Sequence, residues 1–273
     1  MNKYSVLTTV YKKEEPLFLR QSIDSMLNQT IPPSEYVVVK DGPLTEELNN
    51  ILQEYSSSNP IFKIVSLEVN SGLGVACIEG LEACTNDYVA RLDSDDISLP
   101  NRCELQLKEL ENDQDLAVVG SDIYEFDDNP NVIKAIKKMP SEPDDIYKFG
   151  KKRNPFNHST VMMRKSIVQS KGGYSPMRRS QDLELFTRLL YKGCKCRNIP
   201  QPLVLFRTGD ARVKRKKNWT NLKHDIKVYK RNYKENYISL MEFLYVVVRQ
   251  FIFYLMPKGM ASYLYTKIYR DKV

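Results

Sequence analysis

Histidine is nearly absent from this 273-residue chain, which contains only His158 and His224. Metal sites built mainly on imidazole, such as the two-histidine motif of zinc peptidases or a three-histidine zinc centre, are therefore excluded. Any metal ion in this protein has to be held mainly by carboxylates.

Cysteine pairs and an apolar leader are also missing. The five cysteines are Cys77, Cys84, Cys103, Cys194 and Cys196, and no two of them form a Cys-x-x-Cys pair. Scattered thiols of this kind are typical of a reducing compartment. The sequence begins Met-Asn-Lys and passes straight into a strand-like run, without an apolar signal region. We therefore expect a cytoplasmic protein.

What the chain does contain is ordinary globular material with an uneven charge. Hydrophobic residues make up 42% of it, which is enough for a buried core, and the net charge is +7. Between Arg207 and Lys234, eleven lysines and arginines stand against two acidic residues, whereas the rest of the chain holds 30 basic and 32 acidic residues. The body is thus nearly neutral, and the basic character belongs to one segment.

Short β-branched runs alternate with amphipathic stretches over the first 120 residues. The expected strands are Tyr4–Val10, Tyr36–Lys40, Phe62–Leu67, Tyr88–Leu92 and Leu116–Gly120, and the expected helices are Glu15–Asn28, Glu46–Tyr55, Val75–Ala83 and Arg102–Glu111. Apolar strands separated by helices predict an α/β fold with a mostly parallel, Rossmann-like sheet covered on both faces. Later expected elements are the strands Thr160–Arg164 and Leu203–Arg207 and the helix Asp182–Tyr191.

Polar segments follow the first four expected strands. They are Tyr11, Asp41-Gly42, Asn70-Ser71-Gly72-Leu73-Gly74 and Asp93-Ser94-Asp95-Asp96. The carboxyl ends of parallel strands meet at one edge of a sheet, where such folds bind ligands. We therefore expect a nucleotide crevice there, in which Asp41 accepts hydrogen bonds from a base or ribose and the glycines let backbone N–H groups approach closely.

The acidic run Asp93-Ser94-Asp95-Asp96 carries the sharpest chemical signal. Three carboxylates within four positions repel one another unless a cation is present. Asp93 and Asp95 project to one side of an extended chain, and hard oxygen ligands suit Mg²⁺ or Mn²⁺ on a diphosphate. The alternative is a solvated acidic turn in which Asp96 caps a helix. The position at the end of the fourth strand favours the metal.

The segment Gly72–Cys77 resembles a dinucleotide-binding fingerprint, because Gly-x-Gly follows an expected strand and opens a helix. The third glycine of that fingerprint is Cys77 here, and the segment follows the third strand instead of the first. These departures argue against a nicotinamide-dependent dehydrogenase.

Asp182 stands at the start of an expected helix, after the stretch Gly172-Gly173-Tyr174. The helix dipole favours a charged carboxylate in the first turn, which a general base requires. An ordinary helix start with Asp182 as N-cap is the alternative. The nucleotide-type loops upstream favour the functional interpretation.

Together these segments resemble the family 2 glycosyltransferases, which are inverting enzymes of the GT-A fold. The resemblance rests on the strand ending at Tyr11, Lys40-Asp41-Gly42, Asn70-x-Gly72-x-Gly74, Leu92-Asp93-Ser94-Asp95-Asp96 with Pro100 and Arg102, and Gln181-Asp182. The segment Asn154–Met162 is similar to that of the branch that builds bacterial capsule, exopolysaccharide and O-antigen repeats. The resemblance spans about Ser5 to Phe206. Lys40 and Gln181 depart from it, since many members have acidic residues there.

For donor binding, the resemblance implies roles for several matching positions. The backbone and side chains around Thr8 and Tyr11, with Asp41, would hold the uracil or ribose of a UDP-sugar. Arg91 and the Asn70–Gly74 loop, including Gly74, would line the nucleotide cleft.

For catalysis, the resemblance implies that Asp93 touches the ribose or the sugar and that Asp95 coordinates Mn²⁺ or Mg²⁺ on the diphosphate. Asp182 would be the catalytic base of one inverting displacement that gives a β-linked product. His158 would contact the donor sugar or the acceptor, although a histidine just before a buried strand is more often a structural hydrogen-bonding residue.

Residues 1–209 are expected to form the GT-A catalytic domain, and residues 210–273 a basic, aromatic, helical tail. The tail contains the basic run Arg212–Lys217 and the 14-residue apolar stretch Phe243–Met256. A transmembrane helix needs about 20 apolar residues, so this stretch suits instead a helix in the interface of an anionic membrane. Packing on the core, or a homodimer through these helices, is the alternative.

The resemblance thus implies an enzyme that moves a sugar from a UDP-sugar, with UDP-galactose the first candidate, to a glycan acceptor linked to undecaprenyl diphosphate. It would act peripherally at the inner face of the cell membrane. A nucleotidyltransferase acting on a sugar phosphate also places aspartates beside a parallel sheet, but it normally has a glycine-rich loop where this chain has Val10–Glu15. A nucleic-acid-binding protein would use the basic segment, but no nucleic-acid motif is present.

Overall fold

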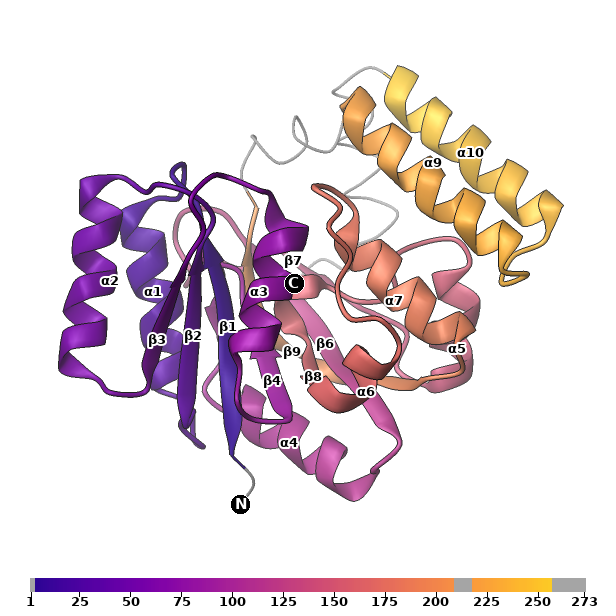
Figure 1. The fold of residues 1–273 in the computed structure, drawn as a ribbon. Coiled ribbons are helices and arrows are strands. Elements are labelled where there is room, and N and C mark those ends of the chain that lie inside the picture. The colour runs from indigo at the N-terminus through magenta and orange to yellow at the C-terminus, as the bar shows by residue number, and fades with distance from the viewer. Residues whose placement is uncertain (1–2, 209–217, 257–273) are drawn as a thin grey trace.

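The computed structural model describes residues 3–208 and 218–256, in which one sheet carries helices on both faces (Figure 1). Its strands lie in the order β3, β2, β1, β4, β8, β6, β9, β5, and β7 pairs with β6. Their bounds are β1 (Tyr4–Val10), β2 (Glu35–Lys40), β3 (Phe62–Ser66), β4 (Tyr88–Arg91), β5 (Ile97–Ser98), β6 (Leu116–Phe126), β7 (Ala135–Lys137), β8 (Met162–Arg164) and β9 (Lys195–Arg207).

The first four strands form the parallel part of the sheet. β1 pairs in parallel with β2 and β4, and β2 pairs in parallel with β3. The connections run through α1 (Pro16–Leu27), α2 (Glu46–Ser58) and α3 (Leu73–Ala83). Every residue of β1 is buried, as expected for an apolar strand with helices on both faces. The α/β fold predicted from the sequence is confirmed.

The sheet is mixed beyond β4, which the sequence pattern did not predict. β8 lies antiparallel between β4 and β6, so the fourth and fifth expected strands are not neighbours. β6 extends to Phe126 and pairs in parallel with the long β9. The apolar run at 160–164 marked a strand correctly, but a local pattern holds no information on where in a sheet that strand inserts.

Two apolar layers lie on the two faces of the sheet (Figure 1). On one face α1, α2 and α4 (Arg102–Asn112) contribute side chains such as Leu19, Ile51 and Leu107. On the other face pack α3, α5 (Pro143–Gly150), α6 (Lys165–Ser170) and α7 (Gln181–Tyr191). A 3-10 turn, η1 (His158–Thr160), leads into β8. Both faces are covered, as the sequence predicts.

The C-terminal helices α9 (Trp219–Lys234) and α10 (Leu240–Leu255) form a pair beyond α7 and α5 (Figure 1). The pair packs on the preceding part of the chain through buried residues that include Leu222, Val228, Tyr229, Tyr237 and Val246. Packing on the core was one of the alternatives for this region. The basic run 212–217 and the expected boundary at 209/210 lie outside the described residues.

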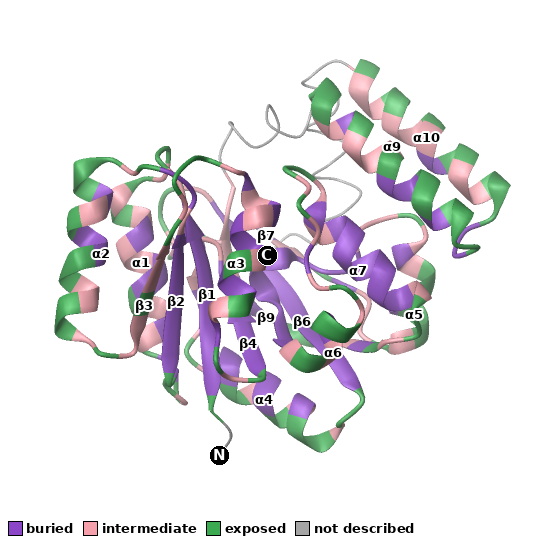
Figure 2. Cartoon of the chain, viewed as in Figure 1, coloured by how far each residue is buried: buried purple, intermediate pink, exposed green. Residues whose placement is uncertain are grey.

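α10 has an apolar face that is largely exposed. Its exposed large side chains are Leu240, Met241, Leu244, Tyr245, Val248, Phe251, Ile252 and Leu255. Figure 2 shows that exposed and half-buried residues dominate this helix, whereas the strands of the sheet are buried. Within the ranges 3–208 and 218–256, no helix combines the length and the apolar character needed to cross a bilayer.

Candidate active site

A cavity of about 1200 Å³ opens where the strands of the parallel half end. The segments after β1, β2, β3 and β4 form one side of it, and the start of α7 together with α9 and α10 forms the other. Six of the site residues expected from the sequence line this cavity: Tyr11, Asp41, Asn70, Asp93, Asp95 and Asp182. The predicted convergence of the polar loops is therefore present.

Asp41 organises the loop that follows β3. Its Oδ1 accepts hydrogen bonds from the backbone N–H groups of Ser71 (2.7 Å) and Gly72 (3.1 Å), and the Asn70 side-chain amide donates to Oδ2 (3.0 Å). Gly72 has a φ of +94°, a left-handed conformation that favours glycine. The Asp41 carboxylate, 6% exposed, thus fixes the shape of this wall of the cavity.

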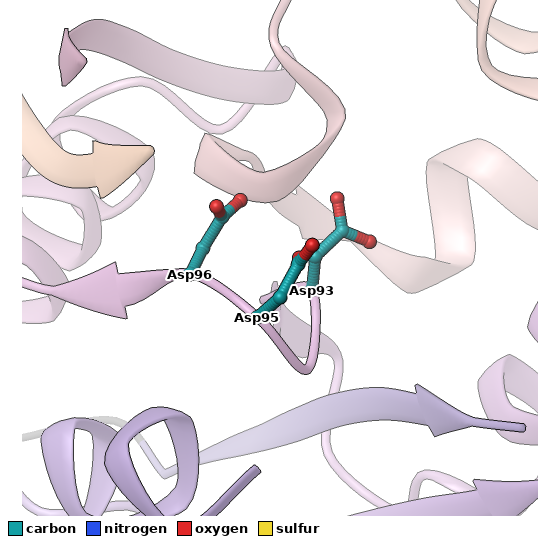
Figure 3. A group of neighbouring side chains, drawn as sticks. All are labelled: Asp93, Asp95 and Asp96. Carbon is teal, nitrogen blue, oxygen red and sulfur yellow. The ribbon is translucent and has the colours of Figure 1, made fainter. Parts of the chain in front are cut away.

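The acidic run after β4 brings three carboxylates together. Asp93, Asp95 and Asp96 each place a carboxylate oxygen within 4.8 Å of the others, and their side chains rise on the same side of the loop (Figure 3). Burial, reinforced by the charges of Asp95 and Asp93, raises the pKa of Asp96 well above its ordinary value. Asp96 leads into β5 and does not cap a helix, so the helix-cap alternative for this residue is wrong.

Two arginines hold this loop in place. The fully buried Arg91 forms an ion pair with Asp93 (Nη1 to Oδ1, 2.5 Å) and donates to Thr9 Oγ1 (3.3 Å). Arg207 donates through Nε to the carbonyl of Asp95 (3.0 Å) and through its backbone N–H to Asp96 Oδ1 (2.9 Å). Arg207 also stacks 3.6 Å above the ring of Phe18. Sequence reasoning missed Arg207, because nothing local distinguishes it from the basic segment that it begins.

This constellation fits a hard divalent cation. The oxygens are close enough to share one ion, and Mg²⁺ and Mn²⁺ prefer such ligands. Asp96 Oδ2 is buried and has no hydrogen-bond partner among the residues 3–208 and 218–256, so this face of the cluster holds an acceptor atom that none of them satisfies. A divalent ion would offset the repulsion between the three carboxylates.

Asp182 lies in the first turn of α7, as expected, and it lines the cavity. Ser180, with a left-handed φ of 59°, precedes the helix and is its N-cap, so the N-cap alternative for Asp182 is wrong. The side-chain amide of Asn154 donates to Asp182 Oδ2 (2.6 Å), and this hydrogen bond holds the carboxylate in one orientation. Asn154 begins the segment that resembles the polysaccharide branch, but the sequence did not indicate its contact with Asp182.

Four expected site residues lie behind the cavity wall. The Thr8 side chain pairs with the Tyr36 hydroxyl (3.2 Å), and Thr9 lines the cavity in its place. Gly74 does not line the cavity: a Cβ there would lie 2.4 Å from the carbonyl oxygens of Ser175 and Met177, so this glycine permits close packing of two loops. Arg91 is buried behind Asp93, as described above.

His158, the fourth of these residues, belongs to η1 and is 9% exposed. Its Nε2 lies 2.8 Å from the hydroxyl of Tyr174, and burial, together with the charge of Arg91, lowers its pKa to about 3. The imidazole is therefore neutral at physiological pH. Its geometry is that of the structural hydrogen-bonding residue that was the alternative interpretation.

The chain belongs to glycosyl transferase family 2: the model of that family, "Glycosyl transferase family 2", matches residues 5–170. The resemblance deduced from the motifs is thereby confirmed. Membership in this family of sugar-transferring enzymes argues against the dehydrogenase, the nucleotidyltransferase and the nucleic-acid-binding module.

Individual relatives align over nearly the full length. A UDP-Gal:alpha-D-GlcNAc-diphosphoundecaprenol beta-1,3-galactosyltransferase of Escherichia coli is 35% identical over 268 residues, which cover 98% of this chain and 97% of the relative. The amylovoran biosynthesis glycosyltransferase AmsE of Erwinia amylovora is 34% identical, with 97% and 98% covered. These alignments include α7, α9 and α10, which lie beyond the residues matched by the family model.

Among solved structures, S. aureus TarS shares the fold. Its 1-349 fragment in complex with UDP gives a TM-score of 0.65 at 13% identity, covering 97% of this chain and 76% of that one. A longer TarS chain, of which this protein spans 43%, gives a TM-score of 0.68 at 14% identity. At this level of identity the likeness establishes the GT-A-type architecture alone.

Proposed function

We propose that this protein transfers a sugar, with galactose the first candidate, from a UDP-sugar to a lipid-linked glycan acceptor, with inversion to a β-linkage, during synthesis of a bacterial surface polysaccharide. The observation that carries this proposal is that Asp182 lines the same cavity as Asp93 and Asp95, which form a carboxylate cluster with Asp96. The named activity of the E. coli relative and the UDP bound to TarS support the choice of donor and acceptor.

The donor nucleotide occupies the side of the cavity formed by the strand ends. Tyr11 and Asp41 lie where the uracil and ribose are held, and Thr9 takes the place first assigned to Thr8. The loop Asn70–Gly72, shaped by Asp41, forms the adjoining wall. Asp93, neutralised by Arg91, faces the ribose or the donor sugar.

Asp95 would hold Mn²⁺ or Mg²⁺, with Asp93 and Asp96 close enough to contribute. When bound, the ion would supply Lewis-acid stabilisation of the charge that develops on the UDP leaving group. Arg207 keeps the carbonyl of Asp95 and the carboxylate of Asp96 in place.

Asp182 accepts the proton of the acceptor hydroxyl as that hydroxyl attacks the anomeric carbon from the face opposite to UDP. Asn154 donates to one oxygen of this carboxylate and so holds the carboxylate in one orientation. General-base assistance of this type contributes roughly 10²–10⁴ in rate. One displacement with one base inverts the anomeric centre, so an α-linked donor gives a β-linked product.

The enzyme works peripherally on the cytoplasmic face of the membrane, where a polyprenyl-linked acceptor resides. The exposed apolar face of α10 suits the interfacial region of a bilayer. Co-sedimentation with anionic vesicles over a salt series tests this part, and wild-type protein that stays in solution at low salt would contradict it. A homodimer through the same face is the competing explanation, and sedimentation velocity without lipid distinguishes it.

The donor site is tested by calorimetric titration of UDP with and without Mn²⁺, on the wild type, on Asp95→Ala and on Asp115→Ala. Asp115 is an exposed aspartate outside the cavity and provides the matched control. We expect metal-dependent binding that Asp95→Ala loses and Asp115→Ala keeps. An absence of UDP binding by the wild type under both conditions would overturn the proposed donor.

A further inference from the structure

The cavity has a second end with a different chemical character from the donor side. On the helical side, near Asp182, it is lined by Arg153 and Arg249, together with the apolar side chains of Phe149, Ile252 and Phe253. Arg179, on the loop that leads into α7, is exposed on the same cavity wall and forms no ion pair with a carboxylate in the described ranges. This part of the cavity therefore combines cations with apolar surface, and it also contains Asp225, which accepts a hydrogen bond from Gln250 (3.2 Å), the neighbour of Arg249.

Arg153 and Arg249 come together although they belong to distant parts of the chain. Arg249, on α10, donates to the backbone carbonyl of Lys152 (2.5 Å), the residue next to Arg153. Burial raises the pKa of the Tyr229 hydroxyl, Arg249 and Arg153 lower it in part, and the nearby Asp225 raises it. Two positive charges, with the carboxylate of Asp225 nearby, thus lie on the same side of the cavity.

This pair of cations lies next to the proposed catalytic base. Asn154, the neighbour of Arg153, is the residue that donates to Asp182. An acceptor hydroxyl placed at Asp182 therefore directs the remainder of the acceptor towards Arg153 and Arg249, or towards the strand ends. The strand ends are already taken by the donor nucleotide in the proposed function.

We propose that this end of the cavity is the binding site for the diphosphate and the first isoprene units of the acceptor. Arg153 and Arg249 contact the diphosphate oxygens, Arg179 adds a third positive charge, and Ile252 and Phe253 contact the start of the lipid chain. Guanidinium groups pair with phosphate oxygens through short, charge-assisted hydrogen bonds. The assignment rests on the proposed function and specifies which surface of the protein recognises its lipid-linked acceptor.

The exposed apolar face of α10 extends this arrangement to the membrane. Ile252 both lines the cavity and stands among the exposed apolar residues of the helix. The same helix therefore presents apolar surface to the cavity and to the outside. A lipid chain that leaves the cavity along α10 stays on apolar surface until it enters the bilayer.

Steady-state kinetics with two acceptors test the assignment. One acceptor is N-acetylglucosaminyl diphosphate carrying an alkyl chain, and the other is the corresponding alkyl N-acetylglucosaminide, which lacks the diphosphate. We expect Arg153→Gln and Arg249→Gln each to raise the KM of the diphosphate acceptor on the order of 10-fold, since each removes a hydrogen bond between charged groups. The KM of the UDP-sugar and that of the uncharged acceptor stay within about two-fold of the wild type.

Lys230→Gln provides the matched control, because it removes the same charge from an exposed position of α9 outside the cavity. It leaves both acceptors unaffected. An equal change of KM for the two acceptors in the arginine variants, or a rise in the KM of the UDP-sugar, would overturn the assignment.

A measurement on the wild type keeps the test independent of whether the variants fold. Geranyl diphosphate carries a diphosphate and isoprene units but no sugar, and we expect it to compete with the acceptor and not with the UDP-sugar. Competition with the UDP-sugar would place its diphosphate at the donor site and refute this inference while the proposed function stands. Failure of the wild type to bind UDP would instead refute the proposed function, and this inference with it.

Discussion

The two sides of the cavity are held by different means. On the strand side, the catalytic loops follow buried strands and are tied down by Asp41, Arg91 and Arg207. On the helical side, α10 has a single fully buried side chain, Val246, and a largely exposed apolar face. Polar links complete the attachment of the helical pair: Ser180 donates to Asp225 (2.5 Å), and Arg231 pairs with Glu184 (2.7 Å).

This difference agrees with the proposed function, in which the strand side binds the donor and the helical side binds the acceptor. Apart from Arg207, the proposed donor side lies in the part matched by the family model, residues 5–170, whereas Asp182 and the helical pair lie beyond it. A nucleotide and a metal ion require a constant, rigid set of ligands, which buried strand ends provide. An acceptor wall can vary between enzymes without disturbing that set. We therefore expect changes on the strand side to affect donor binding, and changes on the helical side to affect acceptor use.

The largest effect is expected where the two sides meet, at Asp182. Asp182→Asn keeps the size of the side chain and removes its capacity to accept a proton. We expect kcat to fall by roughly 10²–10⁴. UDP affinity, measured by calorimetry with Mn²⁺ present, stays unchanged because the donor ligands belong to the strand side.

Asp144→Asn is the control for this substitution, since Asp144 is exposed on α5 and does not line the cavity. It retains full transfer. Wild-type turnover by Asp182→Asn in a sugar-transfer assay would show that another group takes the proton. Asp182 would then not be the residue at which the donor and acceptor sides meet.

The second largest effect concerns the buried charges of α7. Glu184 accepts from Arg188 (2.8 Å), and both side chains are about 95% buried, whereas Arg231 of α9, its other partner, is 48% exposed. Breaking a buried pair leaves an uncompensated charge, so Glu184→Gln should lower the free energy of unfolding by about 3 kcal/mol. Arg231→Gln removes only the exposed partner and should cost about 1 kcal/mol or less.

Urea unfolding of the two variants measures this difference directly. Equal losses would mean that the exposed link between α9 and α7 contributes as much stability as the buried ion pair within α7. A large loss of unfolding free energy for Arg231→Gln alone would mean that the exposed ion pair is the stronger of the two.

The strand side is also where sequence reasoning succeeded. The first four strands are bounded within about a residue of their expected ends, because each is a short apolar run between clear breaks. The edge at which their loops meet follows from parallel pairing alone. Five of the residues that line the cavity, Tyr11, Asp41, Asn70, Asp93 and Asp95, were predicted in this way, since polar residues directly after buried strands have few other reasons to be there.

What the sequence did not reveal depends on long-range contacts. The insertion of β8 between β4 and β6, the contact of Asn154 with Asp182, and the anchoring of the acidic loop by Arg207 each join residues far apart in the chain. Thr8 was assigned in place of Thr9, because alternation along a strand does not say which face of β1 meets the cavity. The apolar pattern of α10 likewise leaves open which surface it meets.

The smallest expected effect tests the strand side by its response to pH. His158 is held neutral in the folded protein, where burial lowers its pKa to about 3, whereas an unfolded histidine titrates near 6.5. Between these two values the unfolded chain binds a proton that the folded protein excludes, so this residue makes the free energy of unfolding fall as the pH falls. From pH 7 to pH 5 its contribution amounts to about 2 kcal/mol.

His158→Gln should therefore flatten the pH dependence of stability in this range by about that amount, as measured by urea unfolding at the two pH values. The same substitution at His224, on α9, controls for the loss of an imidazole as such. The acidic cluster, including Asp96, is common to all three proteins and cancels in the comparison. An unaltered slope in His158→Gln would mean that the folded protein admits a proton at this position, and the strand side would then be less sealed from solvent than its packing indicates.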